Sequence, residues 1–179
     1  MRFAAFTLLL FLASSGYAQE PPFDFKGIAL GSDISSIENT SRFSCRDPQS
    51  PIADRVCSLK FGERETIAGA SVEVLLLYYY SGKLETISIS FSAKHFSEVA
   101  AALTEKYGAG SVKTEAVQNR MGATFENKIY SWRRDNATLE AKRYSSKLDR
   151  SSVMYRTDFA QQEFARRRGT TVKEKAKDL

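Results

Sequence analysis

Residues that could carry out catalysis are sparse in this chain of 179 residues. His95 is the only histidine, and we expect it to be an exposed residue at the start of a helix. Catalytic triads and most zinc sites need an imidazole together with fitting partners, and one imidazole alone supplies neither. The S-x-x-K and G-x-S-x-G motifs of serine nucleophiles are also absent. We therefore expect no catalytic residue, no metal site, no cofactor and no enzymatic activity.

Carboxylates offer the one remaining route to hydrolysis. They are scattered along the chain without a D-x-D metal loop, at Asp47, Asp54, Glu63, Glu65 and Glu73 among others. Two carboxylates from distant strands can nevertheless meet in space, as they do in glycosidases. A carboxylate-dependent hydrolase is therefore the third functional hypothesis, after the two binding functions given below.

Cys45 and Cys57 are the only cysteines. A lone pair of cysteines in an oxidising compartment usually forms a disulfide, and here the bond closes a short polar loop that contains Pro48 and Pro51. The alternative is a redox or metal pair, but the spacing is not C-x-x-C and no histidine is near. We expect a structural disulfide.

Positive charge gathers in the last third of the chain. Residues 19–127 hold 11 basic and 14 acidic residues, whereas residues 128–179 hold 14 basic and 7 acidic residues. Such asymmetry indicates either an anionic partner or a solvated face followed by a basic tail. The candidate partner-binding residues lie on the late strands: Trp132, Arg133, Arg134, Lys142, Arg143 and Arg156. We expect Arg133 and Arg143 to share one face of a hairpin that turns at Asp135–Asn136, with Glu140 or a partner answering their repulsion.

Aromatic residues are candidates for either an interface or the core. Tyr78, Tyr79 and Tyr80 are consecutive, and Tyr130, Trp132 and Tyr144 accompany the late strands. Aromatic side chains on an open sheet face are typical interface hot spots. Strand alternation, however, must turn some of them inward. Few aromatic residues are interleaved with the charges, so we expect no nucleic-acid partner.

The first 18 residues have the organisation of a secretory signal peptide. Met1-Arg2 is a charged start, an apolar run from Phe3 to Leu12 follows, and Gly16 and Ala18 are small residues before the cleavage point. The run is shorter than the roughly 20 residues that span a bilayer. We expect an exported protein, periplasmic or secreted, without an integral membrane span.

Hydrophobic periodicity predicts the elements of the exported part. We expect a strand at 25–30, a helix at 32–40 with Ser32 as N-cap, and a hairpin of strands 72–80 and 86–92. A helix over 93–107 ends at Gly108. Strands at 128–133, 138–144 and 151–159 follow. In the last strand we expect Val153, Tyr155 and Phe159 on one side and Met154 and Arg156 on the other. Residues 161–179 are expected to form a frayed helix and then a disordered tail.

Two short segments look like parts of two copies of one α/β repeat, and this repeat resembles that of a known family. Gly27-Ile-Ala-Leu-Gly31 leads into the first helix, and Leu103-Thr-Glu-Lys-Tyr-Gly108 closes the second. Over residues 25–160 this pattern is similar to the α/β repeat of the β-barrel assembly lipoprotein BamE and of the tandem β-lactamase-inhibitor protein. The chain departs from the first in lacking a lipidated cysteine and from the second in lacking a recognisable inhibitory loop. The resemblance implies a fold, a compartment outside the cytoplasm and a protein-binding role, and it transfers no functional residue.

The sequence thus predicts an α+β fold with two helix-plus-antiparallel-strand repeats and helices on one face of the sheet. The boundaries are 1–18 for the signal peptide, 19–92 for the first repeat with the disulfide loop, 93–160 for the second repeat and 161–179 for the basic tail. The leading function is a non-enzymatic binding module for a protein of the bacterial envelope. The alternative is a binder of anionic lipid or envelope polymer that uses the basic half.

Overall fold

The computed structural model describes residues 21–48 and 52–175, so the expected signal peptide lies outside the described residues. The strands are β1 (Asp24–Phe25), β2 (Ile28–Ala29), β3 (Phe43–Arg46), β4 (Arg55–Leu59), β5 (Thr66–Ile67), β6 (Ala70–Tyr80), β7 (Lys83–Ser92), β8 (Ser111–Gln118), β9 (Thr124–Arg134), β10 (Ala137–Lys142) and β11 (Arg150–Thr157). The helices are α1 (Ser35–Glu38), α2 (Phe96–Tyr107) and α3 (Asp158–Lys175), and a 3-10 turn, Ala93–His95, leads into α2. The fold class is α+β, as predicted.

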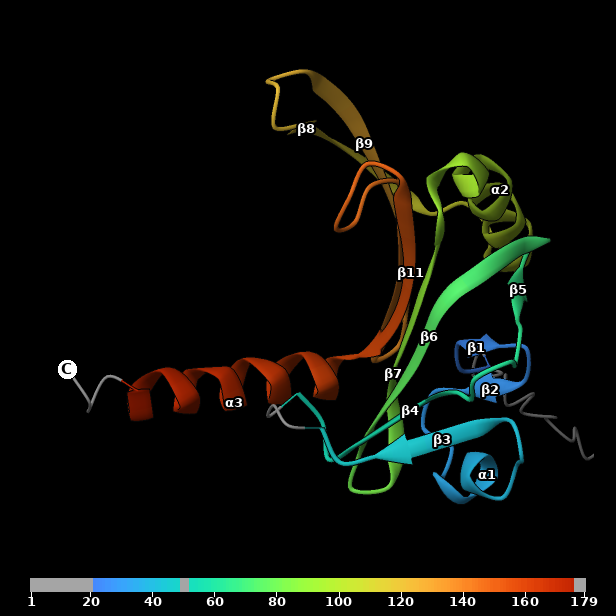
Figure 1. The fold of residues 1–179 in the computed structure, drawn as a ribbon, viewed down its shortest axis with the longest axis vertical. Helices are drawn as coiled ribbons and strands as arrows, with labels where there is room; N and C mark the ends of the chain where they lie inside the picture. Colours follow the sequence, from blue (N-terminus) through green and yellow to red (C-terminus); the bar gives the residue numbers. More distant parts are fainter. Residues whose placement is uncertain (1–20, 49–51, 176–179) are drawn as a thin grey trace, which may run out of the picture.

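One antiparallel sheet organises the molecule. Its strands lie in the order β3-β4-β6-β7-β11-β10-β9-β8, and β5 pairs with part of β6. The strands on both sides of the boundary expected at residue 92 belong to this sheet, because β7 pairs with β11 from Ser92 opposite Arg150 to Thr86 opposite Arg156. Helix α2, helix α1 and the small β1–β2 sheet lie on one side of it, whereas α3 projects from the other side (Figure 1). We call the first side the core face and the second side the open face. The expectation that the helices lie on one face is therefore wrong for α3.

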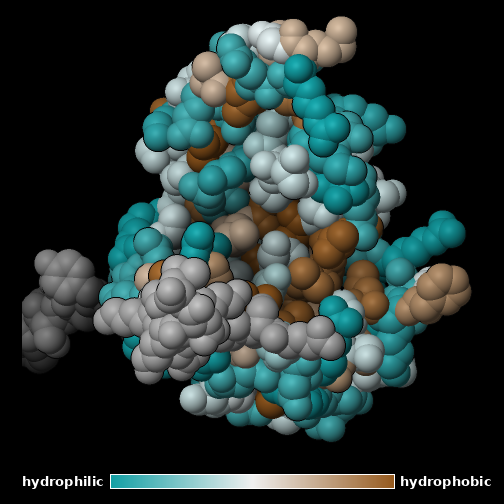
Figure 2. Space-filling model, turned by 60° about the vertical axis from the view of Figure 1, so that its left-hand side comes forward, coloured by the Kyte–Doolittle hydropathy of each residue, from teal (hydrophilic) through white to brown (hydrophobic). Residues whose placement is uncertain are grey.

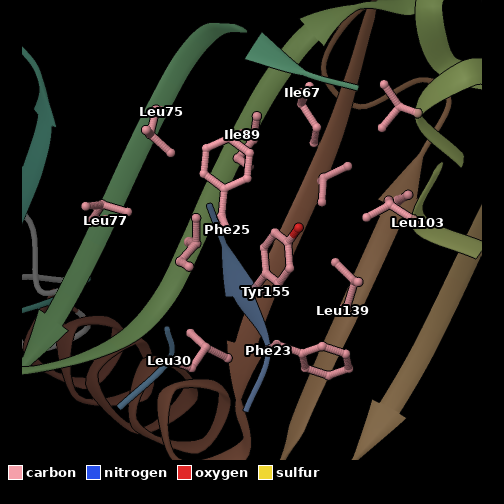
Figure 3. Close-up of a cluster of buried hydrophobic side chains, with 14 of the residues drawn as sticks. Phe23, Phe25, Leu30, Ile67, Leu75, Leu77, Ile89, Leu103, Leu139 and Tyr155 are labelled. Atoms are coloured by element: carbon pink, nitrogen blue, oxygen red, sulfur yellow. The ribbon is translucent and has the colours of Figure 1, made fainter. Parts of the chain in front are cut away.

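The main core lies between the sheet and the elements on the core face (Figure 3). Alternate residues of the central strands are fully buried there, including Leu77 of β6, Ile89 of β7, Val153 of β11 and Leu139 of β10. Helix α2 adds the face formed by Phe96, Val99, Ala100 and Leu103, the same face that the helical period of the sequence predicts. Burial of these apolar side chains is the main stabilising contribution to the fold.

The predicted hairpin of residues 72–92 is confirmed by β6 and β7, which turn at Ser81–Gly82. The expected strand at 25–30 is wrong, because Lys26 and Gly27 have positive φ angles of 50° and 83° and fold the segment into the β1–β2 hairpin. The expected first helix shortens to the four residues of α1. Its N-cap is Ile34 instead of Ser32, and the carboxylate of Asp33 accepts a hydrogen bond from the backbone N–H of Ser35.

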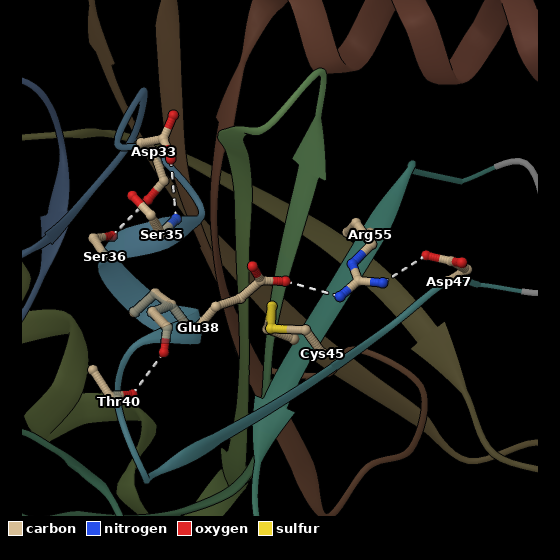
Figure 4. The surroundings of a disulfide bond; sticks show 10 residues. Asp33, Ser35, Ser36, Glu38, Thr40, Cys45, Asp47 and Arg55 are labelled. Carbon is tan, nitrogen blue, oxygen red and sulfur yellow. Dashed lines mark hydrogen bonds and ion pairs between the residues drawn. A yellow bond between two sulfur atoms is a disulfide. The ribbon is translucent and has the colours of Figure 1, made fainter.

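The expected disulfide between Cys45 and Cys57 is present, and it joins two paired strands at the base of the connection between them. The two cysteines are directly opposite each other on β3 and β4. Nearby, the guanidinium of Arg55 contacts Glu38 of α1 at 2.8 Å and Asp47 at 3.0 Å (Figure 4). The disulfide links β3 to β4, and the ion pair between Arg55 and Glu38 connects β4 to α1. A disulfide of this kind persists in an oxidising compartment.

Strand β8 is an element that periodicity does not predict. Every second residue of Ser111–Gln118 is exposed and the others are exposed or only partly buried, because β8 is the outer strand of the sheet. An edge strand without a buried face has no apolar alternation to detect. Strand β9 also begins earlier than expected, at Thr124.

The strand expected at 151–159 ends too late, because β11 stops at Thr157 and Phe159 belongs to helix α3. Helix α3 begins at Asp158, slightly before the helix expected in the basic tail, and continues to Lys175. Its first turns contact β11 and β7, and the rest extends away from the sheet (Figure 1). The tail expected beyond it falls on residues 176–179, outside the described residues. Within residues 21–48 and 52–175, no helix is long and apolar enough to cross a membrane.

Candidate functional site

The open face is built by the residues that alternate with the core residues. Register places Leu76, Ser88, Met154 and Glu140 in one row across β6, β7, β11 and β10. The next row is formed by Tyr78, Thr86, Arg156, Thr138 and Arg133. The face is therefore apolar on β6, rich in hydroxyl groups on β7 and charged on β10.

Apolar side chains form a strip on β6 and β11. Val74 is 40% exposed, and Leu76, Tyr78 and Met154 are partly buried. Leu76 and Tyr78 pack against a second, smaller cluster of Ala53, Val56, Tyr80 and Ala160 that is separate from the main core. Figure 2 shows apolar side chains gathered near the middle of this side of the molecule. We call Val74, Leu76, Tyr78 and Met154 the apolar strip.

Helix α3 stands at one end of the apolar strip and is fixed there by Tyr80. The Tyr80 ring meets Phe159 edge-on at 5.9 Å, and the guanidinium of Arg167 lies over the same ring at 5.0 Å. The hydroxyl of Tyr80 donates to the carbonyl of Ile52. Arg167 also contacts Asp54 at 2.8 Å and Glu163 at 2.7 Å. The helix thus forms a wall beside the strip.

Charged groups around α3 hold carboxylates in their ionised form. Hydrogen bonds from Arg166 and Arg167 lower the pKa of Glu163 to about 2. The backbone N–H of Ser81 and the side chain of Arg167 lower the pKa of Asp54. In contrast, burial raises the pKa of Tyr78 on the floor of the face. Both carboxylates are therefore charged at neutral pH, and Tyr78 is a neutral hydrogen-bonding group.

A pocket of about 130 Å³ opens between the apolar strip and α3. Its walls include Tyr78, Tyr80, Met154 and Phe164, and its polar groups come from Thr86 and Arg156. The guanidinium of Arg156 contacts the sulfur of Met154. We call this space the Arg156 pocket.

The structure divides the candidate partner-binding residues between the two faces. Arg133, Lys142 and Arg156 lie on the open face, together with Thr138 and Glu140. Lys142 contacts Glu140 at 3.1 Å, and Arg133 contacts Asp158 at 2.6 Å. Arg156 is thus the member of the candidate set that lies in a pocket on this face.

The expected common face for Arg133 and Arg143 is wrong. The turn has two residues, so Arg134 pairs with Ala137 and Arg133 pairs with Thr138. Odd positions of β9 therefore share a face with even positions of β10. The backbone N–H of Arg143 donates to the carbonyl of Lys128, and Arg143 therefore lies on the core face, opposite to Arg133. Its guanidinium lies over the Tyr144 ring at 5.0 Å.

Trp132 also belongs to the core face and not to the open face. It is only 5% exposed, its ring stacks on Tyr130 at 6.1 Å, and its indole N–H donates to the carbonyl of Gly108 at 2.7 Å. Arg134 lies on the same side, over the rings of Phe23 and Tyr107. A buried and hydrogen-bonded tryptophan is a packing residue, so Trp132 and Arg134 leave the set of candidates for this face.

The carboxylates considered for hydrolysis all form ion pairs. Asp47 contacts Arg55, Asp54 contacts Arg167, Glu63 and Glu65 contact Arg42, and Glu73 contacts Arg150. His95 is the last residue of the 3-10 turn before α2, and it is partly buried where an exposed side chain was expected. In the part of the chain that the structure describes, no three histidine, cysteine or acidic residues are grouped so as to hold a metal ion.

The apolar strip could have been found in the sequence. Val72 to Tyr80 reads as a nearly continuous apolar run, which predicts a strand with apolar residues on both faces. Only one face of β6 packs into the main core, so Val74, Leu76 and Tyr78 remain on the other face. What the sequence does not indicate is that α3 covers just one end of this strip.

No protein-family model, no curated protein and no solved structure matches this chain.

Proposed function

We propose that this protein is an exported, non-enzymatic binding module that engages a protein of the bacterial envelope through its open face. The observation that carries the proposal is the apolar strip on an uncovered side of the sheet. An exposed apolar patch rimmed by polar residues is typical of protein-binding surfaces. Tyr78 and Met154 are residue types enriched in such interfaces. The residues of β7 between them, Thr86 and Ser88, are small.

A partly apolar face favours a protein over an anionic lipid or polymer. Of the late-strand cations, Arg133 and Lys142 contact carboxylates of this chain, and Arg143 lies on the core face. The positive charge of the C-terminal half is thus divided and partly neutralised. An anionic surface would be better served by cations gathered on one side.

The order of the elements supports a proposed origin of the fold from two repeats. Helix α1 precedes β3, β4, β6 and β7, and helix α2 precedes β8, β9, β10 and β11. In the sheet each set lies in chain order, and the two sets meet at their last strands, β7 and β11. We propose that this arrangement is of the kind found in the BamE-like and β-lactamase-inhibitor-like repeat proteins, which themselves bind proteins.

Photo-crosslinking in intact cells of the source organism tests the protein-binding proposal. A photoreactive residue replaces Val74 on the open face. A matched one replaces Val112, which is 56% exposed on β8 and lies on the side of the sheet opposite to the open face. We expect one defined adduct from position 74 and none from position 112. The crosslinked protein is then purified, and its affinity is measured for the wild type and for Leu76→Asp.

The outcomes separate the alternatives. Leu76→Asp should abolish the interaction because it puts a charge into the apolar strip, whereas Val112→Asp should leave it unchanged. Binding that falls steeply between low and physiological salt and is unaffected by Leu76→Asp would instead indicate the anionic lipid or polymer. Equal crosslinking from both positions would contradict the proposal.

A further inference from the structure

Arg156 differs from the other arginines near the apolar strip. Arg133, Arg150 and Arg167 each contact a carboxylate, at 2.6 Å, 2.8 Å and 2.8 Å respectively. Arg156 is partly buried, and among the described residues its guanidinium contacts no carboxylate. A partly buried cation without an anion lacks both full hydration and a charge partner. Its environment therefore favours an incoming negative group.

The surroundings of Arg156 are apolar. Tyr78, Tyr80, Met154 and Phe164 form walls around it, and the 130 Å³ space beside it is large enough for one side chain of moderate size. Thr86, opposite Tyr78 and Arg156 in the sheet register, lies in the same lining and carries a hydroxyl group. The pocket thus combines one cation, one hydroxyl and several apolar surfaces.

We propose that the Arg156 pocket recognises an acidic residue adjacent to an aromatic residue in the partner protein. The carboxylate pairs with the guanidinium of Arg156, and the neighbouring ring enters the space between Met154 and Phe164. This inference rests on the proposed function and names the chemistry of its partner. Charge complementarity supports it, because Arg156 provides the positive charge while Tyr78 stays neutral.

A protein segment fits this pocket better than an isolated anion does. Inorganic anions would gain the charge contact but would leave the apolar walls empty. A carboxylate in reach of a partly desolvated arginine forms a charge-assisted hydrogen bond, which is stronger than a neutral one. The apolar strip continues from the pocket along β6, so the flanking residues of the same segment can contact Leu76 and Val74.

Short peptides test the pocket without knowledge of the partner. The probes are acetylated and amidated tetrapeptides of sequence Ala-Asp-Phe-Ala, Ala-Asn-Phe-Ala and Ala-Asp-Ala-Ala, titrated into the mature protein while backbone amide resonances are recorded by NMR. We expect only the Asp-Phe peptide to move the amides of Thr86, Met154 and Ala160. Arg156→Gln should weaken that binding about tenfold, as expected for loss of a charge-assisted contact. The matched change Arg120→Gln, at the exposed β8–β9 turn, should leave it unchanged.

Each result decides one of the two proposals. Equal shifts from all three peptides, no shift from any, or full binding by a folded Arg156→Gln variant would overturn the acidic–aromatic specificity. A crosslinked partner that is lost in Leu76→Asp but retained in Arg156→Gln would overturn it as well and leave the protein-binding function standing. Binding to phosphatidylglycerol vesicles that Arg156→Gln reduces, without discrimination among the peptides, would assign the pocket to lipid and contradict the inference.

Discussion

Arg133 of β9 and Asp158, the first residue of α3, are joined by two hydrogen bonds of 2.6 Å between guanidinium and carboxylate. The bidentate pair fixes the point at which the chain leaves the sheet and enters the helix. Asp158 also lies at the helix N-terminus, where the helix dipole favours negative charge. The pair therefore sets the direction of α3 beside the open face.

Replacement of Arg133 by Ala should loosen the start of α3. The pair is exposed, so we expect little change in the melting temperature of the whole protein. Amide hydrogen exchange in the first turns of α3 should nevertheless become faster. Lys142→Ala, which removes an ion pair on the same face without contact to α3, serves as control. Unchanged exchange in Arg133→Ala would show that packing alone positions the helix.

The disulfide should stabilise the protein substantially. Cys45→Ala opens a cross-link that spans 12 positions of the chain, and we expect the free energy of unfolding to fall by about 2–4 kcal/mol. Urea unfolding followed by the fluorescence of Trp132, the only tryptophan, measures the change. The wild type treated with reductant should unfold at a similarly lowered urea concentration. Two titratable thiols in natively purified protein would contradict the prediction.

Gly110 should tolerate no side chain, because a Cβ atom there would lie 2.7 Å from the Trp132 ring and 2.9 Å from the carbonyl of Ser131. Gly110→Ala must therefore displace the tryptophan or the backbone, and we expect a loss of about 1–3 kcal/mol. Trp132 fluorescence should shift as its hydrogen bond to Gly108 is disturbed. Gly169→Ala in α3, where nothing lies within 4 Å, should be neutral or stabilise the helix. Equal melting of Gly110→Ala and wild type would refute this account.

Acid should weaken helix α3 itself, because Glu163 and the two arginines that bind its carboxylate all lie within this helix. The pKa of Glu163 is lowered from 4.5 to about 2 by its hydrogen bonds to Arg166 and Arg167. A carboxylate with a lowered pKa stabilises the folded form above its unfolded pKa, and that contribution is lost as the pH falls from about 4.5 toward 2. Carboxyl NMR should give Glu163 a titration midpoint near 2.

Two arginine variants check the origin of that pKa. Arg167→Met should raise the titration midpoint of Glu163 because it removes one hydrogen-bond donor. Arg168→Met removes an exposed charge in the same helix and should have a smaller effect. An ordinary titration midpoint for Glu163 in the wild type would mean that the arginines do not hold it in solution.

The parts of the fold that could be predicted are those with a strong period. Ile87, Ile89 and Phe91 alternate with serine and threonine, and β7 forms as expected. The helical spacing of Phe96, Val99 and Leu103 likewise gives α2. Strand β8 has almost no buried residue, so its backbone pairing with β9 leaves no trace in residue types.

The sequence predicts the candidate site only in part, because the pairing register of the strands decides which side chains share a face. Alternation correctly separates Met154 and Arg156 from Val153 and Tyr155. The faces of Arg133 and Arg143 depend on how many residues the turn contains, and Asp135, with a φ of 34°, makes it a two-residue turn. The burial of Tyr80 depends on contact with α3, which begins almost eighty residues later. Long-range contacts of this kind have no local pattern.

The pairing of β7 with β11 has a consequence for the order in which the molecule is made. Strand β11 is the last strand along the described chain, yet it lies in the middle of the sheet between β7 and β10. A chain that ends before residue 150 would leave β7 and β10 as two open strand edges, which are prone to pair with other chains. During synthesis the two halves can therefore form their own hairpins but cannot join. The complete sheet can form only after β11 has left the ribosome, and until then its two groups of strands remain separate.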